Sequence, residues 1–239
     1  MSIPVFNPLN SDWLMFPLVL AGIFAVIGFA EILLKRFRWS GENSRRVVHV
    51  LVGVLICGTL FLFESKYPVM VLSIIFIGVN LATLLSKQFE GMHATNRVSF
   101  GTVYYPVSIL VLTYFFWNAN PVVYLLSILI LAIGDPIASV VGESADKPKS
   151  FAVWKDSKSV QGSAALALVI FLLTFSGMRL GESAGLLSPG SGSVLMVALV
   201  TTVIGTAAES ISNAGSDNFS LPLLSAAILD VMIRLSYSG

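Results

Sequence analysis

Three carboxylates stand at the ends of apolar segments of the sequence, where an unpaired charge is costly in a membrane. Asp135 follows a long apolar run and precedes a proline, and Glu209 and Asp217 flank a polar turn near the C-terminus. Carboxylate oxygens are the ligands that a hard cation such as Mg²⁺ takes in proteins. The sequence therefore predicts that Asp135, Glu209 and Asp217 bind Mg²⁺. Asp217 or its neighbour Asn218 could instead cap a helix, but a cap leaves Glu209 unexplained.

Basic residues with phosphate-binding character precede another apolar segment. Arg45, Arg46 and His49 are three and four residues apart, so they share one face of a helix. Guanidinium groups suit phosphates, although the two arginines alone could also anchor a membrane protein. A membrane anchor needs no imidazole one turn inside the apolar run, and imidazole titrates near neutral pH. We therefore predict phosphate contacts from the arginines and proton transfer by His49, with a carboxylate that binds no metal as the alternative base.

The Gly-Asp-Pro segment around Asp135 predicts a distorted helix with a functional face. On a helix, Asp135, Ser139 and Gly142 point the same way, and Pro136 removes a backbone hydrogen bond. Gly134 and Gly142 allow close approach of another backbone or of a ligand. The alternative is a structural kink in which the aspartate is incidental.

A lysine, a serine and a glycine open a later apolar segment. Lys158, Ser159 and Gly162 would lie at a helix N-terminus, where backbone N–H groups and a nearby ammonium favour phosphate. The spacing is not that of a Walker P-loop. An ordinary N-cap with a basic anchor is the alternative to a phosphate site.

The composition predicts that membrane helices position these groups. Hydrophobic residues make up 56% and charged residues 11% of the 239 residues, against about 45–50% and about 25% in soluble domains. The excess apolar surface must face lipid. We predict an all-α, polytopic transmembrane bundle that forms a single integral membrane domain over residues 1–239. It would have about eight spans, with seven as the alternative, at residues 13–34, 47–63, 68–86, 101–117, 121–142, 160–178, 193–212 and 218–236.

The distribution of positive charge predicts the orientation. Of the 14 Lys and Arg residues, 11 fall in one set of alternating loops, which the positive-inside rule places in the cytoplasm. All the candidate groups lie on that side. We expect a multi-pass protein of a prokaryotic cell membrane with a cytoplasmic active face, surrounded by membrane lipids. The net charge of +1 gives no reason to expect a nucleic acid partner, and the oligomeric state is left open.

Cation ligands and phosphate ligands on one face together predict phosphoryl or nucleotidyl transfer. Such reactions depend mainly on positioning and on neutralisation of charge. A small transporter is an alternative from another class, because intramembrane carboxylates also mark ion pathways. A transporter would have polar residues scattered through the bilayer midplane, whereas here they gather at one face.

The order of these motifs resembles the superfamily of dolichol kinase, phytol kinase and CTP-dependent diacylglycerol kinase. The resemblance covers roughly residues 45–225 and is carried by RRVVH, R-x-x-x-GTVYYP, GDPIASVVGE, KSVQGS and ESISNAGSDNFSLP. It implies a membrane-embedded kinase that transfers phosphate from CTP to a long-chain isoprenoid alcohol or diacylglycerol. The motif positions of the family fall on Arg46, His49, Arg97, Asp135, Gly142, Lys158, Gly162, Glu209, Asp217 and Asn218.

One departure and one competing resemblance qualify this reading. After Gly142 the family often has a basic stretch, whereas this chain continues with Glu143, so we expect Lys158 to hold the nucleotide phosphates. Phosphatidate cytidylyltransferases, which also use CTP, share a similar Gly-Asp segment and lysine-rich turn. Their longer C-terminal signature is absent, so CDP-lipid synthesis is the alternative function.

Overall fold

A computed structural model describes residues 4–38, 40–86, 100–154, 156–187 and 193–237. Over these residues helices account for most of each predicted apolar segment, which confirms a predominantly helical fold. The predicted 121–142 segment forms one continuous helix whose middle, η2 (Ile130–Gly134), is a π-helix. The other parts are α1 (Asp12–Phe37), α2 (Gly41–Thr59), α3 (Tyr67–Ser86), α4 (Gly101–Phe116), α5 (Pro121–Leu129), α6 (Asp135–Ser144), α7 (Val160–Ser183), α8 (Val194–Ser210) and α9 (Asp217–Tyr237).

Several of these helices are long and apolar enough to cross a membrane. Among the described residues there are five, namely α1, α3, the continuous helix Pro121–Ser144, α7 and α9, while α4 and α8 are apolar but shorter. Large hydrophobic side chains such as Leu18, Leu168 and Val203 are exposed on their surfaces, as expected where lipid is the solvent. The chain is therefore a helical membrane protein, and the number of about eight spans stays a prediction.

Two expectations about local structure need correction. The 143–159 loop contains a short antiparallel hairpin of β1 (Ser150–Val153) and β2 (Asp156–Ser159), so the fold is not purely helical. In addition, α2 begins at Gly41, well before the apolar run at residue 47. Ser40 caps it by accepting a hydrogen bond from the backbone N–H of Asn43 at 3.2 Å. The helix therefore extends past its apolar part and carries Arg45 and Arg46 on a regular turn.

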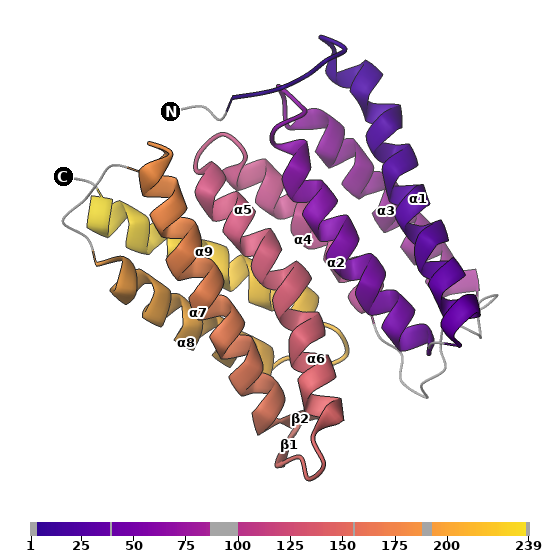
Figure 1. The fold of residues 1–239 in the computed structure, drawn as a ribbon, viewed down its shortest axis with the longest axis vertical. Coiled ribbons are helices and arrows are strands. Elements are labelled where there is room, and N and C mark those ends of the chain that lie inside the picture. The colour runs from indigo at the N-terminus through magenta and orange to yellow at the C-terminus, as the bar shows by residue number, and fades with distance from the viewer. Residues whose placement is uncertain (1–3, 39, 87–99, 155, 188–192, 238–239) are drawn as a thin grey trace.

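The continuous helix of α5, η2 and α6 runs through the middle of the bundle (Figure 1). Helices α1 to α4 lie on one side of it, and α7 and α8 lie on the other. Helix α9 packs against α4, α5 and α8, which joins the two sides. The α6 end of the central helix leads into the hairpin and then α7, so this end of the bundle collects most of the predicted site residues.

Close packing between α2 and the π-helix predicts a position that tolerates no side chain. A Cβ on Gly53 would overlap the Cβ of Ala132 and lie 2.6 Å from Oη of Tyr105. We expect Gly53→Ala to destabilise the protein by about 1–3 kcal/mol, the usual cost of overpacking. Gly58→Ala, in the same helix, is the control because a methyl group there meets nothing within 4 Å. Equal melting temperatures of the two variants in detergent would contradict this packing.

Candidate active site

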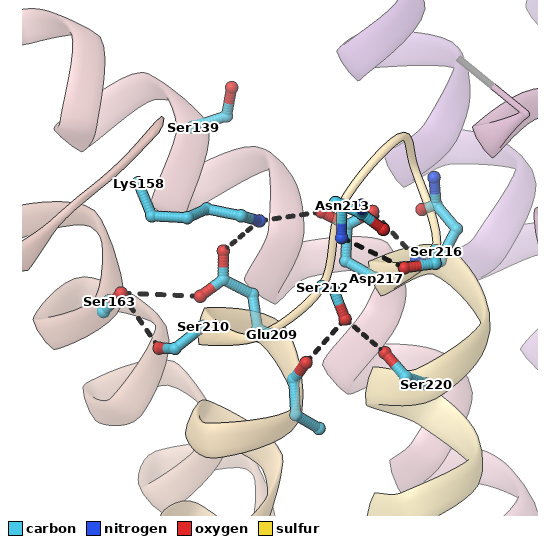
Figure 2. A network of polar contacts seen from close by, with 12 residues as sticks. Ser139, Lys158, Ser163, Glu209, Ser210, Ser212, Asn213, Ser216, Asp217 and Ser220 are labelled. Carbon is cyan, nitrogen blue, oxygen red and sulfur yellow. Dashed lines mark hydrogen bonds and ion pairs between the residues drawn. The ribbon is translucent and has the colours of Figure 1, made fainter. Parts of the chain in front are cut away.

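A buried lysine joins two of the predicted carboxylates. Nζ of Lys158 donates to Oε1 of Glu209 at 2.5 Å and to Oδ2 of Asp217 at 2.9 Å (Figure 2). The three side chains are 18%, 6% and 15% exposed, respectively. Ser163 donates to the other carboxylate oxygen of Glu209 at 3.4 Å. The structure thus brings together three of the predicted site residues from three separate segments.

The local fold explains how these side chains meet. Lys158 lies on β2 opposite Phe151, one residue before the N-cap of α7, where Oγ of Ser159 accepts from the backbone N–H of Gly162. The hairpin therefore fixes Lys158 at the start of α7. Glu209 belongs to the last turn of α8, and Asp217 is the first residue of α9. A tight turn with positive φ at Ala214 and Gly215 reverses the chain between these helices.

The electrostatics favour a charged lysine. Burial alone lowers the pKa of the Lys158 ammonium, but the charges and hydrogen bonds of Asp217 and Glu209 outweigh burial and raise this pKa above its usual range. The charge of Asp135 also interacts with those of Asp217, Lys158, Arg45 and Glu209. The four predicted positions Asp135, Lys158, Glu209 and Asp217 therefore share one electrostatic environment.

Arg46 connects α2 to α6 through side-chain contacts near Lys158, Glu209 and Asp217. It is buried, and its guanidinium donates to Oγ of Ser139 at 2.7 Å and to Oδ1 of Asn43 at 2.9 Å. It also forms an ion pair with Glu143. The acidic residue that departs from the family pattern thus has a partner in Arg46. The neighbouring Arg45 pairs with Glu42 at 2.6 Å.

His49 contacts the backbone of the π-helix. Its Nε2 lies 3.2 Å from the carbonyl oxygen of Leu131, and its ring packs on Tyr105 with 4.2 Å between ring centroids. In a π-helix the donor for that carbonyl would be the N–H of residue 136, which is a proline and has none. A carbonyl only accepts, so Nε2 donates and the Nδ1 of a neutral ring is left as an acceptor. The predicted local opening at Pro136 takes the form of this π-helix.

A small polar pocket connects the arginines with the aspartate. Its lining consists of Arg45, Arg46, His49, Asp135 and Pro136. Two motifs that are separated by almost ninety positions in the chain thus face one space, as the sequence predicted. The free space between them is only about 10 Å³, enough for one water molecule, so a phosphate would have to displace side chains to reach the two guanidinium groups.

The predicted glycines allow η2 and α6 to pack closely against α7. A Cβ on Gly142 would lie 2.6 Å from Oγ of Ser159, and one on Gly162 would lie 2.7 Å from the carbonyl oxygen of Ala138. A Cβ on Gly134 would lie 2.7 Å from Cδ1 of Leu166. Close helix packing accounts for all three glycines, and their part in nucleotide binding stays a prediction.

The predicted Mg²⁺ ligands are only partly assembled. The described residues contain no group of three or more His, Cys, Asp and Glu side chains that is arranged to hold a metal. Glu209 and Asp217 do converge, with the Lys158 ammonium between them. Two carboxylates that already share a cation fit Mg²⁺, which commonly takes one or two carboxylates together with substrate phosphates.

The predicted set of site residues and the residues found at the site differ at a few positions. Arg97, predicted from the family motif, lies outside the described residues. Asn43 contacts Arg46 but was not predicted as a member of the site, and Ser163, the last residue of the KSVQGS motif, contacts Glu209 although it was given no role of its own. Helical spacing could have indicated both of them, because Ser163 is four residues after Ser159 and Asn43 is three before Arg46.

Comparison with known proteins identifies relatives along almost the whole chain. The chain is 27% identical to the phytol kinase of Synechocystis over 219 residues, which are 90% of each chain. It is 29% identical to probable phytol kinase 2, chloroplastic, of rice (87% of this chain, 72% of the relative). It is 26% identical to the chloroplastic farnesol kinase of Arabidopsis thaliana (92% and 75%). No family model and no solved structure matches. These relatives confirm the resemblance carried by the sequence motifs.

Proposed function

We propose that this chain, a homologue of phytol and farnesol kinases and thus a transferase of phosphorus-containing groups, phosphorylates a long-chain isoprenoid alcohol. The proposed donor is CTP, and the proposed location is the cytoplasmic face of the membrane. The names of the relatives support the class of acceptor. The family motifs support CTP, and the asymmetry of Lys and Arg between loops supports the cytoplasmic face.

The observation that carries the proposal is the buried ion-pair network of Lys158, Glu209 and Asp217. Burying one cation with two carboxylates costs desolvation energy, and such a network is weak evidence for stability alone. Its members come from motifs that the resemblance assigns to phosphate transfer. We therefore expect the ammonium and the two carboxylates of this network to exchange ion-pair partners when a charged substrate binds.

The carboxylates would change partners on nucleotide binding. Glu209 and Asp217, assisted by Asp135, would hold Mg²⁺, which when bound neutralises charge on the nucleotide phosphates. Lys158 would then donate to a phosphate oxygen instead of to the carboxylates. Arg45 and Arg46, which line the pocket with Asp135, would neutralise charge on the transferring phosphoryl group.

His49 is the proposed base. The alcohol oxygen would form a bond to the γ-phosphorus while the bond from that phosphorus to the bridging oxygen breaks, and CDP leaves. The alcohol proton would pass to Nδ1 of His49, because Nε2 donates to Leu131 and holds the ring in this tautomer. Tyr105, whose hydroxyl donates to the carbonyl oxygen of His49 at 2.9 Å, would keep the base in place.

Position-specific labelling of the nucleotide tests the proposal. Purified protein in detergent with Mg²⁺ and farnesol is incubated with CTP that is labelled either at the γ- or at the α-phosphate. We expect the label to enter the lipid fraction from γ-labelled CTP only. Entry from α-labelled CTP would indicate transfer of CMP and contradict a kinase. Parallel reactions with γ-labelled ATP test the choice of donor, because faster transfer from ATP would contradict CTP dependence.

A further inference from the structure

We propose that an apolar cavity between α1, α2, α3 and α4 binds the hydrocarbon chain of a single-chain alcohol, and that Asn218 binds its hydroxyl group. The proposal rests on the proposed kinase function and names the acceptor site for it. The cavity has a volume of about 270 Å³, at the small end of the range of about 300–1,000 Å³ for ligand pockets. Apolar side chains from all four helices line it, among them Ile23, Val52, Ile56, Leu72, Phe76 and Ile109.

One end of this cavity is polar and adjoins the candidate active site. Arg45 and His49 line both the apolar cavity and the polar pocket that contains Asp135. A chain bound in the cavity with its hydroxyl at this end would thus present the oxygen to the proposed base. The polar lining also includes Asn218, the residue next to Asp217.

Asn218 has an unused hydrogen-bond acceptor. The residue is only 5% exposed, and its side-chain Oδ1 is buried with no hydrogen-bond partner in the part of the chain that the structure describes. Its backbone groups are satisfied, because its N–H donates to Oδ1 of Asp217 and its carbonyl accepts from Oγ of Ser108 at 2.6 Å. A buried amide oxygen without a donor is costly. An alcohol hydroxyl supplies such a donor when the substrate binds, and its lone pairs stay free to face the γ-phosphorus. During transfer the hydroxyl proton would leave Oδ1 of Asn218 and pass to Nδ1 of His49.

The other side of the cavity opens towards lipid. Phe24 of α1 and Val79 of α3 both line it, although they are 59% and 52% exposed. The cavity therefore reaches the lipid-facing surface between α1 and α3. An alcohol dissolved in the bilayer could enter sideways, with its tail left in the membrane and its hydroxyl directed inwards.

The size of the cavity favours one chain over two. A methylene group is close in size to a water molecule, whose share of liquid volume is about 30 Å³, so 270 Å³ holds roughly nine such groups. This is enough for the first part of one isoprenoid chain, with the remainder extending through the lateral opening. Two acyl chains side by side would divide this space into room for roughly four or five groups each, so the cavity favours the single chain of an isoprenoid alcohol over diacylglycerol.

Filling the cavity tests where the chain binds. Val52 lines it, whereas Val54 lies two residues along the same helix and is 47% exposed to lipid. In γ-labelled CTP assays we expect Val52→Phe to raise the KM for farnesol and phytol at least tenfold and to leave the KM for short prenol near that of the wild type. Val54→Phe, the matched control, should leave all three unchanged. Identical chain-length profiles for the two variants would overturn the assignment of the cavity.

Asn218→Leu separates binding of the alcohol from binding of the nucleotide. Loss of one buried hydrogen bond should raise the KM for farnesol about tenfold with little change in the KM for CTP. An increase in the KM for CTP alone would assign Asn218 to the nucleotide and overturn its role with the alcohol.

Photocrosslinking makes the test independent of catalysis. A farnesol analogue with a photoreactive group in its chain is irradiated with the wild-type protein, and the modified peptides are identified by mass spectrometry. We expect adducts on α1 to α4, reduced by excess farnesol and by Val52→Phe but not by Val54→Phe. Adducts elsewhere, or none, would overturn the cavity proposal even if the protein is a kinase. Adducts in the cavity without phosphate transfer would uphold the cavity and contradict the proposed function.

Discussion

Lys158→Met is expected to abolish phosphate transfer and to destabilise the protein by about 3–5 kcal/mol. The substitution leaves Glu209 and Asp217, both mostly buried, without the cation that lies between them. Removal of one partner from a buried ion pair has this cost because the remaining charge is not compensated. Thermal unfolding in detergent measures the loss of stability, and transfer of label from γ-labelled CTP to farnesol measures activity.

A triple variant separates the two roles of Lys158. Adding Glu209→Gln and Asp217→Asn to Lys158→Met removes the uncompensated charges while nearly keeping the side-chain shapes. We expect most of the lost stability to return and activity to stay absent, because the cation and phosphate ligands are then all missing. A single Lys158→Met variant that melts and turns over like the wild type would contradict both roles.

Asp135→Asn should stop catalysis while leaving the protein folded. The change removes a charge and keeps the shape of the side chain in the pocket that it shares with Arg45, Arg46 and His49. We expect transfer to fall by about a hundredfold to a thousandfold, the range for loss of one preorganised charge at a transition state. The assay is run over a Mg²⁺ titration at saturating farnesol, with the melting temperature as the measure of folding.

Asp230→Asn is the matched control for this change. Asp230 lies in α9 and accepts from Nε of Arg234 at 2.7 Å, four residues further along the same helix. The same substitution there breaks one ion pair away from the candidate site, so activity should stay close to that of the wild type. Near-normal turnover by Asp135→Asn at every Mg²⁺ concentration would place the reaction elsewhere.

Most of the helices could be predicted because length and hydropathy determine them. The predicted 68–86, 101–117 and 218–236 segments differ from α3, α4 and α9 by at most one residue at either end. The pairing of Asp230 with Arg234 is equally local, since residues four apart share a helical face. Such features depend on the local sequence, which is why they could be read without knowledge of the packing.

The hairpin and the form of the helix distortion were harder to predict. The strands Ser150–Val153 and Asp156–Ser159 have only four residues each, which is too short for a clear alternating pattern. Pro136 indicated an opened helix, but a π-helix with His49 bonded to Leu131 requires α2 to pack against it. That contact is between residues far apart in the sequence, so no local sequence pattern predicts it.

The membership of the site was predictable, but its internal contacts were not. The family motifs and the shared side of the membrane predicted that Lys158, Glu209 and Asp217 belong to one site. In the sequence, Lys158 is 51 and 59 residues from the other two. The ion pairs between them depend on how α7, α8 and α9 pack. Contact of Asn218 with the nucleotide stays a prediction, and the structure adds that Asn218 lines a cavity formed mainly by four other helices. No short sequence motif indicates the shape of an apolar cavity.

The mass of the lipid product tests the central claim most directly. Farnesol, CTP and Mg²⁺ are incubated with the purified wild-type protein, with Asp135→Asn and with Asp230→Asn, and the extracted lipids are analysed by mass spectrometry. We expect farnesyl monophosphate from the wild type and from Asp230→Asn, and none above background from Asp135→Asn. A cytidine-containing lipid from the wild type, or equal amounts of the monophosphate from all three proteins, would contradict a kinase that acts at this site.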